Sequence, residues 1–235
     1  MPAVDLHCHL LPGVDDGPQR LEESIEYARD AAASGTGTIV ATPHVEMVDV
    51  RTLPARVEIV RSALAEEGID LRVEVGGELK PQSIGSLRQD ELEIIAQGPP
   101  GARWLLYEVP FRGIDEAFVA GARELRRRGF GLLLAHPERS RGFLDGGLDR
   151  LDPLIASGAM IAANVGPLSG REGDERWRAA KLLLDRGAID VVATDAHPPR
   201  RPYQLPDVQG MTRDDHDRLT AQTTAALLRD GLERR

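Results

Sequence analysis

Hydrophobic and polar residues follow two different periods along this chain. Short apolar runs recur along it, and each is followed by a longer segment with helical spacing. The runs predict strands at Ala3–Leu6, Thr38–Ala41, Leu71–Val75, Trp104–Tyr107, Leu132–Ala135, Met160–Ala163 and Asp190–Ala193. Strands that alternate with helices predict parallel pairing through right-handed crossovers, and therefore an α/β fold. The period alone leaves open whether the sheet stays open or closes into a barrel.

The segments between the predicted strands have the pattern of amphipathic helices. One apolar stripe at helical spacing consists of Leu21, Ile25, Ala28 and Ala32. Asp115 is predicted as the N-cap of a helix that ends in the basic run 126–128, with Gly129 beyond it. Gly187 is predicted to end the helix that contains Trp177 in the same way. Both tryptophans, the other being Trp104, are expected in the core.

Composition limits the classes of protein to which this chain can belong. A chain of 235 residues can bury a sizeable core, and we expect one domain over residues 1–235. The net charge of −9 argues against nucleic acid as a partner, because binding to phosphate backbones needs a basic face. The single cysteine, Cys8, excludes an internal disulfide and favours a cytoplasmic location. Without an apolar run near 18 residues or a signal-peptide pattern, no membrane insertion is expected.

Metal-binding side chains recur at the ends of the predicted strands. They are His7, His9, His44, Glu78, Glu108, His136, Asp195 and His197, with Asp16 shortly after the first pair. In a parallel α/β barrel the carboxyl ends of all strands meet on one face. His7 and His9 are two residues apart, so on a strand they point the same way while Cys8 faces the opposite side. Imidazoles and carboxylates suit Zn, Mn or Fe, and their number indicates two or three ions.

Six motifs carry a resemblance to a known family. They are DLHCHLLPGVDDGP, ATPHV, VGGELKP, LLYEVPF, LLAHPER and VVATDAH. In this order they resemble the PHP (polymerase and histidinol phosphatase) superfamily. Within it the chain is most similar to the bacterial manganese-dependent protein tyrosine phosphatases linked to capsule and exopolysaccharide biosynthesis. The similarity extends from Val4 to about Pro202, which is nearly the whole chain.

The resemblance implies a distorted (β/α)7 TIM-like barrel, the PHP fold, with a trinuclear metal centre at the carboxyl ends of its strands. The ions are expected to be Mn²⁺, with Fe or Zn as alternatives. The implied ligands are His7, His9 and Asp195 for one ion, Glu78 as a bridge to a second with Glu108 and His136, and Asp16, His44 and His197 for a third. The ligands of this third, more exposed ion join Arg139 and Arg201 as the implied catalytic set. Both arginines match the family's phosphate-binding positions, but the loop after Asp195 is one residue shorter than expected, so Arg200 competes with Arg201.

The predicted reaction is hydrolysis of a phosphate monoester. Several cations neutralise the phosphate and lower the pKa of bound water, so we expect direct attack by hydroxide without a phosphoenzyme. The expected substrate is a phosphotyrosine protein, with a bacterial tyrosine kinase as a candidate partner. A cysteine-dependent mechanism is excluded, because Val14 stands where its arginine would follow Cys8.

Two other functions stay open at this stage. One is a small-molecule phosphatase of the histidinol-phosphatase type, and the other is a non-catalytic metal-binding PHP module. Modest insertions between the strands leave no room for a large lid, which favours an exposed site and a protein substrate.

Several residues near the motifs have a simpler interpretation. Asp15 is taken as a turn former, and Asn164 as a turn former or a hydrogen-bond partner of substrate or water. Phe111 and Phe143 are expected to pack in the core rather than to form a rim. His216 is expected to be a solvated helix residue.

Overall fold

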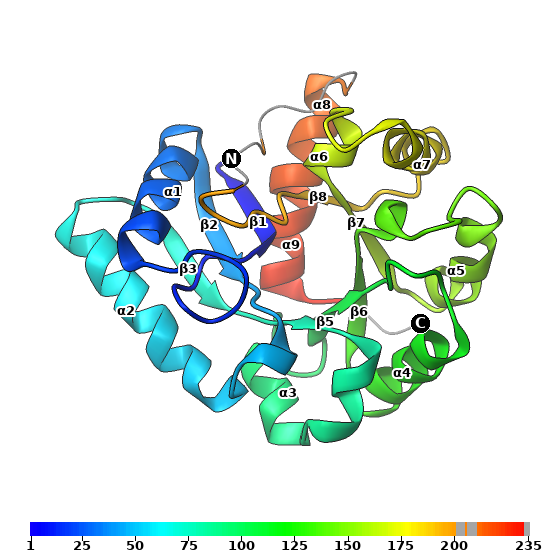
Figure 1. Cartoon of the computed structure of the whole chain (residues 1–235), viewed down its shortest axis with the longest axis horizontal. Coiled ribbons are helices and arrows are strands. Elements are labelled where there is room, and N and C mark those ends of the chain that lie inside the picture. Colours follow the sequence, from blue (N-terminus) through cyan, green and yellow to red (C-terminus); the bar gives the residue numbers. More distant parts are fainter. Residues whose placement is uncertain (201–204, 206–210, 233–235) are drawn as a thin grey trace.

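Parallel strands joined by helices build the chain, as the computed structural model shows for residues 1–200, 205 and 211–232 (Figure 1). The strands are β1 Ala3–Cys8, β2 Thr36–Ala41, β3 Arg72–Val75, β4 Glu78–Leu79, β5 Trp104–Glu108, β6 Gly131–Ala135, β7 Met160–Asn164 and β8 Val191–Ala193. The helices are α1 Leu21–Ala33, α2 Leu53–Glu66, α3 Gln89–Ile95, α4 Glu116–Arg127, α5 Gly147–Ala156, α6 Val165–Leu168, α7 Asp174–Asp185, α8 Arg213–Asp217 and α9 Thr223–Asp230. Shorter turns are the 3-10 segments η1 Val45–Met47, η2 Val50–Thr52, η3 Pro81–Ser86 and η4 Pro137–Arg139, and the π-helical turn η5 Arg218–Gln222 between α8 and α9.

The strands form two parallel sheets, one of β1 to β3 and one of β4 to β8. Within each sheet, strands that follow one another along the chain are neighbours. The sheets meet at the carboxyl ends of their strands through two isolated parallel bridges, Cys8 with Ala196 and His44 with Glu78. The α/β fold with parallel strands is therefore confirmed, and the loops that carry the motifs lie close together.

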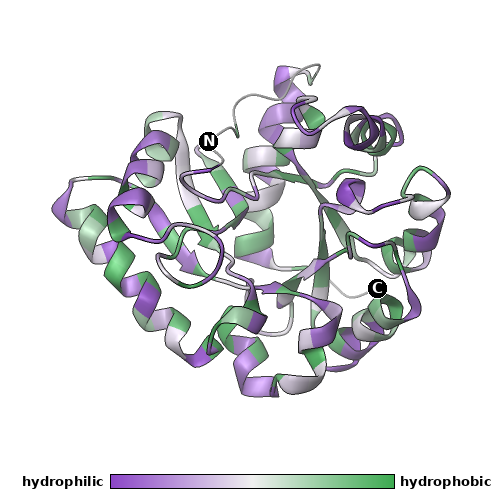
Figure 2. Cartoon of the chain, viewed as in Figure 1, coloured by the Kyte–Doolittle hydropathy of each residue, from purple (hydrophilic) through white to green (hydrophobic). Residues whose placement is uncertain are grey.

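Strands β5, β6 and β8 are buried on both faces, as expected for parallel strands covered by helices, whereas β3 has exposed Arg72. In β5, Trp104 and Leu106 pack in one apolar cluster, whereas Leu105 packs in a second cluster beneath the helices. The first cluster includes Leu227 of α9, whose carbonyl oxygen accepts a hydrogen bond from Trp104 Nε1 at 3.0 Å. Helix α9 thus lies between the two sheets (Figure 1), and the hydropathy colouring shows apolar strands inside mixed helices (Figure 2).

All seven predicted strands are present, and the structure adds β4. This strand has only two residues, too few to show a period, and Glu78 opens it instead of following β3. The Asp115 cap is confirmed, since its carboxylate accepts a hydrogen bond from Phe118 N at 2.9 Å. Gly187 is also confirmed at the end of α7, where it follows the C-cap residue Arg186 and has a φ of 61°.

Two predictions about buried side chains need correction. In α1 the fully buried face includes Tyr27 and Ala31, while Leu21 and Ile25 of the predicted stripe lie at its edge. Trp177 is 42% exposed on α7, so its assignment to the core is wrong. Tyrosine and tryptophan each have an apolar body and a polar tip, so residue type alone does not fix their burial. None of the described helices is both long enough and apolar enough to cross a membrane.

Candidate metal centre

The loops at the carboxyl ends of both sheets bring nine metal-binding side chains together. They are His7, His9, Asp16, His44, Glu78, Glu108, His136, Asp195 and His197, and they form four overlapping groups in which the donor atoms lie within 4.8 Å of one another. Most are buried, but the Asp16 side chain is 51% exposed and that of His44 is 13% exposed. These two residues therefore mark the side on which solvent reaches the cluster.

His7, His9 and Asp195 form one group. The Nε2 atoms of the two imidazoles are 3.4 Å apart, and Asp195 Oδ1 lies 3.4 Å from the first and 3.5 Å from the second. The two histidines point the same way, as their spacing on β1 predicts, and Cys8 between them is buried in the apolar core. Three donors thus face one point in space.

Glu78 lies at the middle of the cluster. Its carboxylate oxygens are 3.5 Å from Nε2 of both His7 and His9, and 2.9 Å from His44 Nδ1 and His136 Nε2. Glu78 thus contacts four of the five imidazoles of the cluster.

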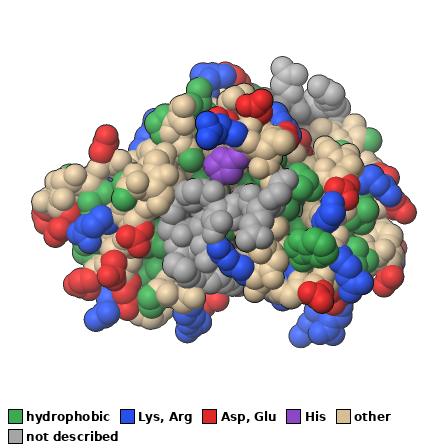
Figure 3. All heavy atoms as spheres, turned by 90° about the horizontal axis from the view of Figure 1, so that it is seen from above, with side chains coloured by type: hydrophobic (Ala, Val, Ile, Leu, Met, Phe, Trp, Pro, Cys, Tyr) green, Lys and Arg blue, Asp and Glu red, His purple; other side chains and the backbone are tan. Residues whose placement is uncertain are grey.

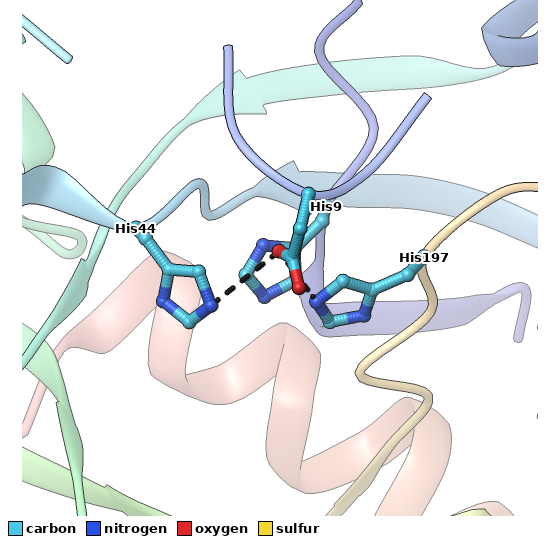
Figure 4. Close-up of side chains that lie close together, drawn as sticks. His9, His44 and His197 are labelled. Carbon is cyan, nitrogen blue, oxygen red and sulfur yellow. Dashed lines mark ion pairs between the residues drawn. The ribbon is translucent and has the colours of Figure 1, made fainter. Parts of the chain in front are cut away.

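The third group lies at the mouth and combines His9, Asp16, His44 and His197. Asp16 Oδ1 is 3.6 Å from His44 Nε2 and 3.2 Å from His197 Nε2. The rings of His9 and His197 are stacked with centroids 3.9 Å apart. Figure 4 shows His9, His44 and His197 close together, with dashed lines for the ion pairs that His44 and His197 make with Asp16.

Glu108 departs from the grouping that the motifs imply. It joins His44 and Glu78 in one group, whereas His136 groups with His7 and Glu78. Glu108 and His136 are therefore not brought into one donor set, although both lie next to Glu78. Lys80 Nζ, 3.8 Å from Glu108 Oε2, partly balances the carboxylate on its other side.

The electrostatics of the cluster suit cations. Burial and the neighbouring Glu78 raise the pKa of Glu108 to about 8. Burial opposes ionisation of Glu78 as well, but the surrounding histidines hold its pKa well below the usual range. Buried Glu108 Oε2 and His136 Nδ1 accept or donate no hydrogen bond among the described residues. Closely packed carboxylates and imidazoles with unused donor atoms fit divalent metal ions.

Asp15, taken from the sequence as a turn former, has a larger role. Its carboxylate oxygen Oδ2 lies 2.6 Å from His9 Nδ1 and also accepts a hydrogen bond from His44 N at 3.0 Å. Burial alone would raise the pKa of Asp15, but the hydrogen bond and charge of His9 lower it to about 2. The aspartate pair in VDDGP was a visible signal, yet nothing in it indicated which carboxylate would face the histidine.

Other polar residues form hydrogen bonds with the candidate ligands, directly or through a neighbouring residue. Asn164 Nδ2 donates to Asp195 Oδ2 at 2.8 Å, so Asn164 contacts a candidate ligand, a role that was not among those predicted from the sequence. Glu138 in turn accepts the backbone N–H of Asn164 at 2.8 Å. Asp5 Oδ1 accepts the backbone N–H of His7 at 3.2 Å. Asp5 and Glu138 are missed by sequence reasoning because neither stands at a strand end in the right register.

The backbone is strained at two of the candidate ligands. Among the described residues other than glycine, only His136 and Asp195 have positive φ, at 38° and 48°. The left-handed region costs an L residue about 1–2 kcal/mol. Gly17 allows a different close approach, since a Cβ there would lie 2.6 Å from the carbonyl oxygen of His9. The turns that aim these side chains are therefore set by the surrounding fold.

Of the predicted phosphate-binding arginines, Arg139 lies next to the cluster. Arg139 donates to Asp195 Oδ2, lies 3.4 Å from Glu172 Oε2, and has its guanidinium 4.8 Å from the centre of the Phe111 ring. It thus lies at the edge of the cluster. Arg200 is exposed, and Arg201 lies outside the described residues.

The remaining single-residue predictions have mixed outcomes. Phe143 is buried as expected, but Phe111 is 44% exposed and stacks on the His136 ring at 5.4 Å, so it does form part of a rim. His216 is not simply solvated, because its Nε2 lies 3.1 Å from the carbonyl oxygen of Leu205.

Curated relatives and solved structures show which proteins this chain is similar to. The chain is 31% identical over 198 residues to the tyrosine-protein phosphatase YwqE of Bacillus subtilis, covering 83% of this chain and 77% of the relative. It is 30% identical over 209 residues to the putative tyrosine-protein phosphatase CapC of Staphylococcus aureus, covering 86% and 80%. It also matches the tyrosine-protein phosphatase CpsB of Streptococcus pneumoniae at 26% identity over 205 residues, covering 83% and 82%.

Among solved structures, one chain from the work on YwqE of B. subtilis and CpsB of S. pneumoniae superposes with a TM-score of 0.79. The two are described as unique metal-dependent tyrosine phosphatases, and the match covers 99% of this chain and 97% of that one at 25% identity. The phosphotriesterase homology protein of Escherichia coli, with a TM-score of 0.64 at 14% identity over 94% and 97%, shares the fold alone.

A family model settles the assignment that the motifs predicted. The model of capsular polysaccharide synthesis proteins, CpsB/CapC, matches residues 3–230, which is almost the entire sequence. The resemblance found in the six motifs is thereby confirmed. This chain belongs to the CpsB/CapC family.

Proposed function

We propose that this chain is a metal-dependent phosphomonoester hydrolase that acts as a protein tyrosine phosphatase. The observation that carries the proposal is the convergence of five imidazoles and four carboxylates within four overlapping donor groups. Relatives with up to 31% identity are named tyrosine phosphatases, and the structural neighbour is described as metal-dependent. A buried polar cluster of this size serves chemistry better than it serves stability.

The metal ions are proposed to be three, with Mn²⁺ as the expected metal and Fe or Zn as alternatives. His7, His9 and Asp195 would hold one ion, and Asp16, His44 and His197 would hold another near the mouth. Glu78, Glu108 and His136 would hold the remaining ion, and Glu78 would bridge it to the first ion. When bound, such ions neutralise phosphate oxygens and lower the pKa of water that attacks phosphorus.

The chain's own residues orient the substrate. The guanidinium of Arg139 lies at the edge of the cluster, where its planar fork suits two oxygens of a phosphate. Arg139 is held by Asp195 and by Glu172, so its approach to the cluster is fixed before substrate arrives. Arg201 is proposed as the second phosphate contact, with Arg200 as the alternative. The half-exposed Asp16 marks the side from which the phosphate enters.

The substrate is proposed to be phosphotyrosine in a protein, in a system that regulates capsule or exopolysaccharide synthesis. The CpsB/CapC family description supports the link to capsular polysaccharide, and a bacterial tyrosine kinase is the candidate partner. A site that opens toward solvent through Asp16 and His44 suits a side chain presented on a protein surface.

Finer features of the molecule are proposed with the function. The two sheets, joined at both bridges, would form a distorted (β/α)7 barrel that spans residues 1–235 as one domain. Support comes from the bridges at Cys8–Ala196 and His44–Glu78, which link the sheets on two sides. A cytoplasmic location is proposed because the one cysteine is a free, buried thiol.

The proposal is tested with purified protein that is stripped of metal and reloaded with manganese, iron or zinc. Turnover of a phosphotyrosine peptide should exceed that of a phosphoserine peptide and of histidinol phosphate. His9→Ala and Glu108→Ala should each lower kcat at least about a hundredfold while leaving the circular dichroism spectrum unchanged. Glu66→Ala on the exposed end of α2 is the matched control and should retain full activity.

Two results would reject the proposal. Faster turnover of histidinol phosphate than of the phosphotyrosine peptide would reject the substrate. Near-normal rates in either His9→Ala or Glu108→Ala would reject the assignment of the metal centre.

A further inference from the structure

A second hollow, the side pocket, lies directly beside the candidate metal centre. It has a volume of about 250 Å³ and is lined by the loop after β5, the loop after η4 and helix α7. Its lining residues include Phe111, Arg139, Arg141, Leu144, Glu175 and Arg176. In Figure 1 the two loops lie on the same side of the molecule as β6, β7 and α7. A side pocket of this size is smaller than the roughly 300–1,000 Å³ of most metabolite sites and suits one amino-acid side chain.

Phe111 connects the side pocket to the metal centre. One face of its ring stacks on His136 with centroids 5.4 Å apart, and the guanidinium of Arg139 lies 4.8 Å from its centre. Arg139 and Phe111 both line the side pocket, so the wall of one site is also the wall of the other. The side pocket is therefore adjacent to the place where the phosphotyrosine is proposed to bind.

The rim of the side pocket exposes apolar surface. Phe111 is 44% exposed and Leu144 is 38% exposed, whereas most large hydrophobic side chains in the described part of the chain are buried. Trp177, 42% exposed, follows Arg176 on α7. Exposed apolar residues beside a catalytic site are typical of surfaces that bind a partner.

The charges on the walls favour an anion. Three arginines line the side pocket against Glu138 and Glu175, and Glu138 is buried and accepts the N–H of Asn164. Arg176 is paired with Glu172 at 2.5 Å, but no ion pair of the exposed Arg141 is found among the described residues. The whole protein has a net charge of −9, and acidic and basic side chains are interspersed on the face drawn in Figure 3. Because Arg139 is held by Asp195 and Glu172, and Arg176 by Glu172, Arg141 is the arginine of this lining that an acidic segment can approach.

We propose that the side pocket binds an acidic side chain within two residues of the phosphotyrosine, and that Arg141 is the residue that recognises it. This inference rests on the proposed tyrosine phosphatase function and adds a preference for sequence around the phosphorylated residue. Arg141 contributes a charge-assisted hydrogen bond to the carboxylate, while Phe111 and Leu144 cover the aliphatic part of the glutamate.

The test compares phosphotyrosine peptides that carry glutamate, glutamine or lysine at each of the two positions on either side. Manganese-loaded wild-type protein should show kcat/KM for the best glutamate peptide about twofold to fivefold above its glutamine counterpart, as one partly exposed ion pair provides. The difference should shrink at high ionic strength. Para-nitrophenyl phosphate, which has no flanking residue, measures the chemistry alone.

Arg141→Ala should remove the preference for glutamate, and Arg141→Glu should turn it into a preference for lysine. Both variants should hydrolyse para-nitrophenyl phosphate at the wild-type rate, and Arg123→Ala, an exposed arginine on α4, should retain the preference. Equal rates on glutamate and glutamine peptides at every position would overturn the inference while leaving the phosphatase function intact. Hydrolysis of para-nitrophenyl phosphate without any turnover of phosphotyrosine peptides would overturn the proposed function itself.

Discussion

The hydrogen bond between Asp15 and His9 fixes the orientation of an imidazole at the centre of the site. With Nδ1 directed at the Asp15 carboxylate, the Nε2 atom of His9 faces Glu78 and Asp195. A carboxylate behind a metal-binding histidine sets its tautomer and increases its basicity. Both side chains are buried, so water does not replace this contact.

Asp15→Asn should therefore weaken metal binding about 10- to 100-fold. The physical reason is that an amide stabilises the required His9 tautomer less well than a carboxylate does. Isothermal titration of metal-stripped protein with Mn²⁺ measures the affinity, and nitrogen NMR of His9 reports its tautomer. Asp30→Asn, at an exposed position of α1, is the control, and an unchanged Mn²⁺ affinity in Asp15→Asn would contradict this role.

For single residues, the sequence predicts a role only where the spacing between residues determines it. His7 and His9 could be paired because residues two apart on a strand share a face. Asp15 could not, because an aspartate in VDDGP satisfies a turn equally well, and its partner is fixed only by how the loop folds back. Trp177 was misplaced because its residue type does not fix its burial, and the side chain is 42% exposed on α7.

At the scale of elements, helix starts and strand cores follow local rules. The Asp115 carboxylate accepts the Phe118 N–H at the start of α4, and strands β5 and β6 lie where the apolar runs predict them. Strand β4 escapes prediction because two residues have no measurable period. Strand β4 pairs with β5, which comes from a later part of the sequence. This pairing also places Glu78 in the cluster.

Asp115→Ala should reduce the free energy of unfolding by about 0.5–2 kcal/mol, because the first turn of α4 loses its cap. Urea denaturation followed by circular dichroism measures the loss. Asp115→Asn retains a capping oxygen and should be much closer to the wild type. Equal stability of the alanine variant and the wild type would show that this cap contributes nothing.

At the scale of the whole molecule, the metal centre joins the two sheets. His7 belongs to the three-stranded sheet, whereas Glu78 and Glu108 belong to the five-stranded sheet. In the part of the chain that the structure describes, the isolated bridges Cys8–Ala196 and His44–Glu78 pair the backbones of the two sheets. Ions bound among these side chains would therefore add links between the halves of the molecule. The α/β class was predictable from the alternation of strands and helices, but the division into two sheets was not.

Removing the metal should lower the melting temperature by roughly 5 to 10 °C. Ligand at a hundred times its Kd stabilises a protein by about 2.7 kcal/mol, and each kcal/mol shifts the midpoint of a domain of this size by about 2–4 °C. Calorimetry with and without chelator, followed by addition of Mn²⁺, measures the change and its reversal. His9→Ala should show a smaller response, and an identical melting curve after chelation would contradict a structural role for the ions.

The left-handed backbone at His136 and Asp195 bears on how this protein can evolve. Glycine or asparagine adopts that conformation with less strain, so a change to either residue would relax the backbone while it removed a proposed metal ligand. Duplicated copies freed from selection for catalysis can therefore lose their enzymatic role and still keep their shape. A descendant that had lost the enzymatic activity in this way would still be folded.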